Sequence, residues 1–154
     1  MLKTRILLAL FLVLGVLSSC KKELSPEKQA IKDDTLITEF IAKNSIVAIK
    51  HSSGIYYQII SEGTGARPSL TNEVTVGYTG KLLNGNVFDK SNPTATFALN
   101  RLIVGWQIGI PLIKKGGSIR LIVPSGLAYG NSSPGAGIPK NAVLDFTVDL
   151  IDVK

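Results

Sequence analysis

Residues 76–90 read VGYTGKLLNGNVFDK, with an Asn-Gly pair between two apolar runs. The pair is Asn84-Gly85, flanked by Leu82-Leu83 and Val87-Phe88. Asn-Gly tolerates positive φ at both central positions of a type I′ turn, and this turn matches the natural twist of paired strands. The stretch therefore predicts a β-hairpin with its turn at Asn84-Gly85.

Alternating apolar residues occur on both sides of this hairpin, in runs separated by Gly, Pro, Asn and Ser. The runs are Ile55, Tyr57 and Ile59; Val74, Val76 and Tyr78; Ile119, Leu121 and Val123; and Leu144, Phe146, Val148 and Leu150. A period of two is typical of strands with one buried face. We expect a sheet-rich domain in which each of these runs has one buried face.

One helical segment interrupts the strands. Trp106, Ile110 and Ile113 recur at helical spacing, and Gly116-Gly117 is a suitable helix end. Pro111 lies inside the segment, where it removes a backbone hydrogen bond and crowds the preceding turn. We expect a short helix, or one that bends near Ile110.

A second helix is predicted before the strands, at residues 33–45. Leu36, Ile37, Phe40 and Ile41 share one face. This amphipathic helix either packs on its own domain or joins two copies of the chain as a homodimer. The polar residues 20–32 before it are expected to form a tether, because they include few apolar residues to bury, although Ser25-Pro26 suggests a helix start.

Residues 1–19 have the layout of a signal peptide, with Lys3 and Arg5 before an apolar run at 6–17 that is too short to span a bilayer. Leu17-Ser18-Ser19-Cys20 resembles the lipobox of bacterial lipoproteins. The resemblance implies cleavage before Cys20 and lipid attachment to it, which anchors the protein to the membrane of the bacterial cell envelope. Lys21 favours the outer membrane, facing the periplasm. An ordinary signal peptide with a chance cysteine is the alternative.

Cleavage there leaves 135 residues, which is enough for one domain. It also leaves 15 basic residues (17 less Lys3 and Arg5) against 11 acidic ones, and the basic residues are scattered. We therefore expect no nucleic-acid partner.

The sequence lacks the residues that several kinds of chemistry require. His51 is the only histidine and Cys20 the only cysteine, so we expect no metal site. No Gly-x-Ser-x-Gly motif is present, and Gly63-Thr64-Gly65 is not followed by Gly-Lys-Ser/Thr. We expect no nucleophile, cofactor or nucleotide.

Five short elements occur in order: Tyr-Thr-Gly at 78–80, Val-Phe-Asp at 87–89, Gly-Trp at 105–106, Leu-Ala-Tyr-Gly at 127–130 and Ile-Pro at 138–139. The ordered set, over residues 54–153, resembles the FKBP family of peptidyl-prolyl cis-trans isomerases. The resemblance implies an α+β fold: a twisted antiparallel sheet wrapped around one short helix, here preceded by an N-terminal amphipathic helix.

The resemblance also implies an apolar pocket for a proline ring. Its floor would be Trp106, and its walls and rim would be Tyr78, Phe88, Tyr129, Phe146, Leu102 and Ile103. Asp89 would support the pocket through a polar contact, and its alternative role is that of a turn residue. Ile138 would close the far side of the pocket. The main chain at Ile103 and the Tyr129 hydroxyl would bind the substrate backbone. Taken singly, each aromatic is better read as a core residue, and only the ordered set of motifs favours a pocket.

The resemblance implies catalysis of rotation about X-Pro bonds in other polypeptides, without covalent chemistry. The barrier of about 18–20 kcal/mol comes from amide resonance, so an apolar site that favours the twisted amide suffices. Two alternatives stay open: a binding module or chaperone without turnover, and a structural component of an envelope complex. Ala95 leaves the first open, because many family members have an aromatic residue there.

Overall fold

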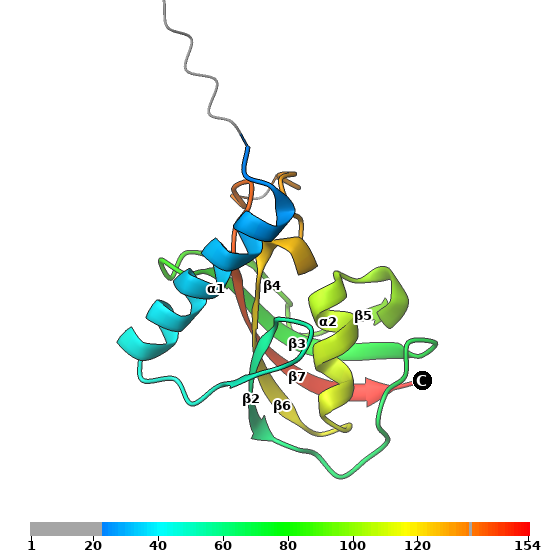
Figure 1. Cartoon of the computed structure of the whole chain (residues 1–154). Coiled ribbons are helices and arrows are strands. Elements are labelled where there is room, and N and C mark those ends of the chain that lie inside the picture. The colour runs from blue at the N-terminus through cyan, green and yellow to red at the C-terminus, as the bar shows by residue number, and fades with distance from the viewer. Residues whose placement is uncertain (1–22, 136) are drawn as a thin grey trace, which may run out of the picture.

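The computed structural model describes residues 23–135 and 137–154. The expected signal peptide at 1–19 and the lipid-attachment residue Cys20 lie outside the described residues. In the part that is described, no helix combines the length and the apolar character needed to cross a bilayer. The remaining chain forms a curved sheet with helices on its two faces (Figure 1).

Within the described residues, seven strands pair antiparallel in one sheet. They are β1 (Ile49–Lys50), β2 (Tyr56–Ser61), β3 (Glu73–Leu82), β4 (Val87–Lys90), β5 (Ala95–Ala98), β6 (Ser118–Val123) and β7 (Leu144–Val153). Their order is β1-β2-β6-β7-β3-β4, and β5 pairs with the other end of the same β3 edge. The long central pair β3–β7 places Gly80 opposite Phe146 and Tyr78 opposite Val148. This confirms the expected antiparallel sheet.

The helix α2 (Val104–Gly109) covers one face of the sheet, and a 3-10 turn, η2 (Ile110–Leu112), follows it directly. Pro111 lies in η2, so the short helix expected from this proline is confirmed. The helical segment ends four residues before the predicted Gly116-Gly117, because the proline cannot continue the hydrogen-bond ladder. Gly109 allows α2 to approach β6 closely, since a Cβ there would lie 2.5 Å from the Leu121 side chain.

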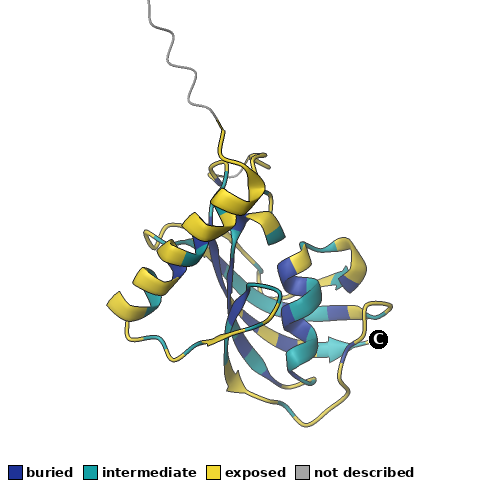
Figure 2. Ribbon diagram, viewed as in Figure 1, coloured by how far each residue is buried: buried dark blue, intermediate teal, exposed yellow. Residues whose placement is uncertain are grey.

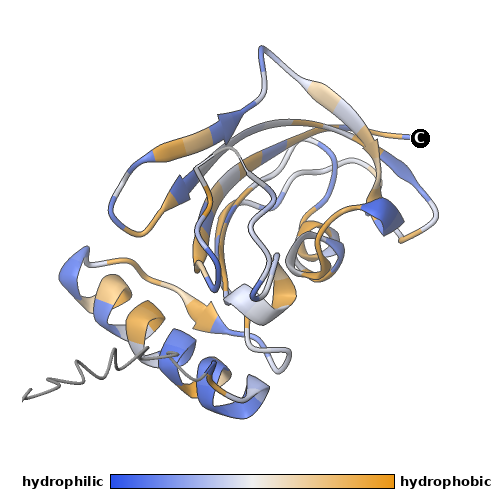
Figure 3. Ribbon diagram, turned by 90° about the horizontal axis from the view of Figure 1, so that it is seen from above, coloured by the Kyte–Doolittle hydropathy of each residue, from blue (hydrophilic) through white to orange (hydrophobic). Residues whose placement is uncertain are grey.

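The main core lies between α2 and the sheet, and seen from above the strands curve around α2 (Figure 3). It includes the buried side chains Val74, Val76, Trp106, Ile110, Ile113, Ile119, Leu121, Val123, Leu144, Phe146, Val148 and Leu150. The predicted buried faces are therefore present on β3, β6 and β7. On β2 the prediction is wrong for Ile59, which is 43% exposed. The register of β2 against β6 shifts between Ile59 and Ser61, so the strand leaves the regular face there.

The helix α1 (Pro26–Lys43) packs on the opposite face of the sheet. The predicted amphipathic helix therefore contacts its own domain. Ile37 is fully buried in a second apolar cluster with Tyr56, Ile122 and Val143, and Phe40 packs at its border. Figure 2 shows that most of the outer surface of α1 is exposed, with burial only toward the sheet. Both faces of β6 are thus covered.

Polar contacts fix the same helix along its length. The Asp34 carboxylate accepts hydrogen bonds from the Lys50 ammonium and the Tyr56 hydroxyl. The Arg120 guanidinium donates two hydrogen bonds to Asp145 at 2.9 and 2.7 Å, and it lies over the Phe40 ring. These contacts link α1 to β1, β2 and β6.

The structure corrects the predicted N-terminal boundaries. The tether expected at 20–32 is helical from Pro26 onward, and the helix expected at 33–45 occupies 26–43. Ser25 is the N-cap, and its hydroxyl accepts a hydrogen bond from the Lys28 amide. Proline at the first helical position and Glu27 in the first turn also favour this start. The prediction failed because it followed apolar spacing, and the first two turns contain little to bury.

The hairpin between β3 and β4 is present, but its turn is not type I′. Only Gly85 has positive φ, at 91°, whereas Asn84 does not. The Gly85 amide donates to the Leu82 carbonyl, and the Leu82 amide donates to the Asn86 carbonyl. The turn therefore starts one residue earlier than predicted and uses glycine alone for the left-handed position.

Candidate functional site

A small cavity opens where α2 meets the twisted end of β3 and β7. Its volume is about 170 Å³, and its lining residues are Tyr78, Phe88, Asp89, Phe97, Leu102, Ile103, Trp106, Tyr129 and Phe146. Four separate segments supply these side chains: the β3–β4 hairpin, the β5–α2 segment, the loop after β6, and β7. The cavity therefore depends on the tertiary fold.

The indole of Trp106 lies at the centre of a set of perpendicular rings. Its centroid is 5.2 Å from that of Tyr78 and 5.3 Å from that of Phe146, with interplanar angles of 85° and 82°. Phe88 continues the set, 5.6 Å from Phe146 at 89°. Such edge-to-face contacts are favourable because the positive edge of one ring meets the negative face of the next. The rings therefore hold one another in a fixed arrangement.

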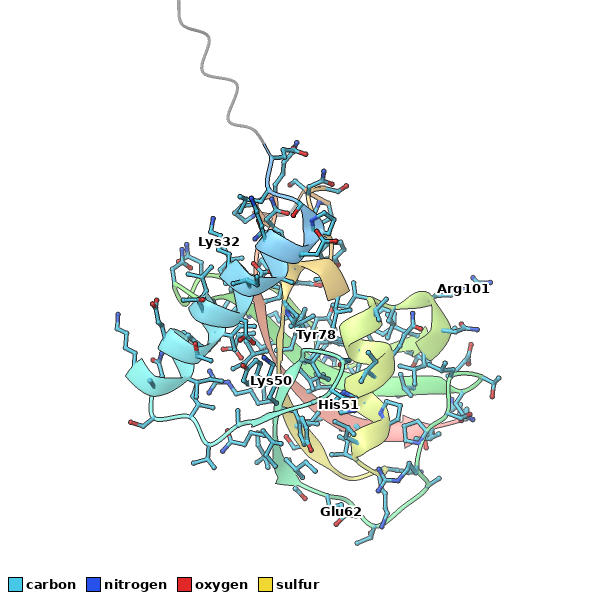
Figure 4. All side chains as sticks on the ribbon, viewed as in Figure 1. Lys32, Lys50, His51, Glu62, Tyr78 and Arg101 are labelled. Atoms are coloured by element: carbon cyan, nitrogen blue, oxygen red, sulfur yellow. The ribbon has the colours of Figure 1, made fainter. Side chains whose placement is uncertain are left out.

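Trp106 is 4% exposed, yet it lines the cavity. Its indole Nε1 is buried and has no hydrogen-bond partner among residues 23–135 and 137–154. Ring packing, and not a hydrogen bond to the rest of the described chain, therefore fixes this side chain. Figure 4 labels Tyr78, which lies beside Trp106 on the side of the sheet that α2 covers.

Gly80 explains why the motif at 78–80 ends in glycine. A Cβ at this position would lie 2.6 Å from the Phe88 ring and 2.9 Å from the Phe146 ring. The backbone of β3 thus leaves room for two aromatic rings that meet above it. Any side chain here would displace at least one of the two rings.

Asp89 gives the cavity its polar edge. Its Oδ2 accepts a hydrogen bond of 2.7 Å from the Tyr78 hydroxyl, and its Oδ1 accepts one from the Lys90 amide at 2.8 Å. Burial, with a smaller effect from this hydrogen bond and the negative charge of Asp89, raises the pKa of Tyr78 to about 12. The phenol therefore stays protonated and keeps donating to Asp89 throughout the physiological range.

Tyr129 contributes the exposed wall. It is 39% exposed, on the loop after η3 (Ser125–Leu127), and burial with the charge of Asp89 raises its pKa. No hydrogen bond of its hydroxyl to another described residue is present in the structure. Its O–H is thus a neutral donor at the cavity, available to a bound molecule.

The structure brings together most of the residues predicted from the sequence. All six predicted catalytic residues and both predicted rim residues line the cavity; they are Tyr78, Phe88, Asp89, Trp106, Tyr129, Phe146, Leu102 and Ile103. Ile138 does not line it and is instead 5% exposed in the main core. The roles of these residues in catalysis stay predictions.

Phe97 is the lining residue that the sequence reasoning missed. Its ring centroid lies 6.3 Å from that of Tyr78, and it pairs with Val74 across β5 and β3. The available signal was its position, two residues after Ala95 in a short strand next to Leu99. Phe97 thus supplies an aromatic side chain to the cavity from the same short strand as Ala95, the residue that left a binding module without turnover open.

A second and larger cavity, of about 740 Å³, lies between α1 and the loop after β6. Ile31 and Asp34 line it from the helix, and Pro124, Leu127 and Asn131 line it from the loop. In the described part of the chain, no group of three or more His, Cys, Asp or Glu side chains is placed to hold a metal ion.

The fold and the cavity define a class of protein: a small antiparallel sheet around one short helix, carrying an aromatic cavity with a polar edge. The model of the family described as FKBP-type peptidyl-prolyl cis-trans isomerase matches residues 65–151, more than half of the chain. The chain therefore belongs to the FKBP-type peptidyl-prolyl cis-trans isomerase family.

Named relatives agree with this assignment. The chain is 40% identical over 131 residues to "Outer membrane protein MIP" of Legionella longbeachae, covering 83% of this chain and 55% of that protein. It is 42% identical over 106 residues to the FKBP-type peptidyl-prolyl cis-trans isomerase FkpA of Escherichia coli (strain K12), covering 67% of this chain and 39% of that one. The chain thus spans only about half the length of these relatives or less.

Two solved structures share the fold. FkpA from Escherichia coli superposes with a TM-score of 0.73 at 38% identity, covering 83% of this chain and 62% of that chain. The peptidyl-prolyl cis-trans isomerase from Pseudomonas syringae gives a TM-score of 0.73 at 29% identity, covering 86% and 98%. The second match covers nearly the whole of the neighbour's solved chain.

Proposed function

We propose that this chain catalyses cis-trans rotation about X-Pro peptide bonds in other polypeptides. The observation that carries the proposal is the cavity of about 170 Å³ whose lining includes Trp106, because its walls are aromatic and its size suits one small ring. Proline carries such a ring in its backbone. The X-Pro peptide bond before it populates both the cis and the trans isomer, and the two isomers exchange slowly.

The aromatic walls fit this reaction because no covalent bond must break. Rotation loses amide resonance, at a barrier of about 18–20 kcal/mol, and the twisted amide is less charge-separated than the planar one. An apolar wall therefore disfavours the planar state relative to the twisted state. Each ~1.4 kcal/mol of this difference gives about tenfold in rate.

Polar groups at the cavity would orient the substrate. The Tyr129 hydroxyl is a protonated donor on the exposed wall, and the main chain at Ile103 lies at the rim. Together they would hold the backbone on either side of the proline while the ring occupies the aromatic floor. Asp89 acts indirectly, because its carboxylate fixes the Tyr78 ring through the hydroxyl.

The place of action that we propose is the bacterial cell envelope. The lipobox-like stretch before Cys20 supports a lipid anchor there, and one relative bears the name "Outer membrane protein MIP". Polypeptides that fold in the envelope would be the substrates. We also propose that two copies can pair through α1, since Ile31 remains 68% exposed on it.

The test follows the relaxation of a peptide enriched in the cis X-Pro form. The 154-residue chain should accelerate relaxation, and Tyr129→Phe should lower kcat/KM by about threefold to tenfold, the effect of one hydrogen bond. Tyr57→Phe is the matched control, because Tyr57 is a partly buried tyrosine of the same domain that does not line the cavity. A relaxation rate equal to that in buffer, at micromolar protein, would refute the proposal.

A further inference from the structure

Asp33 on α1 is a buried carboxylate that the proposed reaction does not use. It is 0% exposed, and its Oδ2 accepts hydrogen bonds from the Ser125 amide at 2.8 Å and the Ser125 hydroxyl at 2.6 Å. Its Oδ1 accepts a third from the Gln29 side chain at 2.7 Å. A buried carboxylate is costly unless such donors surround it. Asp33 and Ser125 are therefore held tightly together, although 92 residues separate them in the sequence.

Ser125 in turn closes the loop that carries Tyr129. Its carbonyl accepts hydrogen bonds from the Ala128 amide at 3.0 Å and the Gly130 amide at 2.8 Å. These two amides are the neighbours of Tyr129 on either side. Every hydrogen-bonding group of Ser125 is thus used: its amide and hydroxyl donate to α1, and its carbonyl holds the Tyr129 loop.

We propose that Asp33 is a positioning residue for the isomerase site, which fixes the wall formed by Tyr129 through Ser125. Figure 1 shows the short turn after β6 lying against the N-terminal half of α1, as these hydrogen bonds require. The inference rests on the proposed function for its effect on catalysis. It gives α1 a role in the reaction, although this helix packs on the face of the sheet opposite to α2.

Asp34, the next residue, provides a matched control. It carries the same charge on the same helix, but its carboxylate binds Lys50 and Tyr56 and makes no hydrogen bond to the loop at 124–131. Both carboxylates link α1 to the rest of the domain, but they bind different elements. Only the removal of Asp33 should release the Tyr129 loop.

The first measurement is amide hydrogen exchange at Ala128 and Gly130 in the 154-residue chain. Asp33→Ala should accelerate exchange at both amides by about tenfold, because Ser125 loses the acceptor that fixes it. Asp33→Asn should give an intermediate rate, since its amide oxygen can still accept from Ser125. Asp34→Ala should leave both rates unchanged. Equal rates in the two alanine variants would overturn the inference, whether or not the chain is an isomerase.

The second measurement is a double-mutant cycle on kcat/KM with the proline peptide. Asp33→Ala should lower kcat/KM by about threefold to tenfold, and most of this loss should disappear in a Tyr129→Phe background, where the hydroxyl to be positioned is absent. Additive losses would overturn the inference. An inactive parent chain would instead refute the proposed function and leave the exchange result standing. If Asp33→Ala does not fold, Ser125→Ala replaces it in both measurements, because it removes a single donor to Asp33.

Discussion

Gly80 is the smallest residue at the site and one of the most constrained. It lies opposite Phe146 on β7 and opposite Asp89 on β4, and both aromatic rings above it occupy the space that a side chain would need. Its role is therefore steric. The rings of Phe88 and Phe146 can meet at right angles only because β3 has no Cβ at this point.

Gly80→Ala should accordingly displace one of these rings and narrow the cavity. We expect a loss of about 1–3 kcal/mol in the free energy of unfolding, as for other overpacked positions. We also expect kcat/KM to fall about tenfold or more, because the displaced ring would occupy the volume for proline. Chemical denaturation and the peptide relaxation assay measure the two effects. Gly126→Ala is the control, since a Cβ there meets nothing within 4 Å.

Individual site residues were predictable where a sequence motif marked them. Tyr78, Phe88 and Trp106 belong to short elements whose order carried the resemblance, and the structure brings all three to one cavity. Phe97 was missed because an aromatic in a four-residue strand has no local signal that separates a lining residue from a core residue. Ile138 was placed at the cavity by its motif, yet its side chain packs into the core.

At the scale of elements, α1 is joined to the sheet by both apolar and polar contacts. Ile37 lies in the apolar cluster on the second face of the sheet, and Asp33, Asp34 and Phe40 contact the domain on either side of it. A helix whose first half is mostly polar is thereby held without a large buried area. Its stability depends on its packing more than on its intrinsic propensity.

Ile37→Ala should therefore destabilise the whole domain, by about 2–4 kcal/mol, since it removes a fully buried side chain from a packed site. Leu36→Ala is the matched control on the neighbouring position, which is 38% exposed, and it should cost under about 1 kcal/mol. Urea denaturation measures both. Equal effects would mean that α1 does not pack on the sheet in solution.

The elements themselves were predicted with uneven success, for physical reasons. Apolar residues recur with a period of two along β3, β6 and β7, so these strands were recognised from the sequence. The first turns of α1 were not recognised, because polar residues that face solvent give no periodic signal. Ser25 and Pro26 were the available signs of the true start, and capping chemistry marks a helix end even where apolar spacing is absent.

At the scale of the molecule, catalysis and stability should respond differently to pH. In the proposed mechanism, no residue that lines the cavity gains or loses a proton while the amide rotates. The two tyrosines at the cavity have raised pKa values, about 12 for Tyr78, so both hydroxyls stay protonated. We expect kcat/KM to be constant between about pH 6 and about pH 9. A bell-shaped profile within that range would contradict a mechanism without acid–base groups.

Stability should decline at alkaline pH. The pKa of Tyr78 in the folded state, about 12, lies above its ordinary value of 10.0. The folded state therefore holds this proton more tightly, and the resulting stabilisation is complete below about pH 10 and is lost as the pH rises toward 12. The Tm, measured by thermal unfolding, should fall as the pH rises from about 10 to about 12. The Tm of the Tyr78→Phe variant, which has no phenolic proton at this position, should fall less steeply.

The chain contains one tryptophan, and that indole is part of the cavity floor. Fluorescence excited at the long-wavelength edge of the protein's near-ultraviolet absorption band therefore comes from this one indole. The indole lies where a proline ring would sit. A ligand that enters the cavity would change the polarity around this indole, so the quantum yield of the indole should report occupancy. The protein thus carries its own optical label for ligand titration.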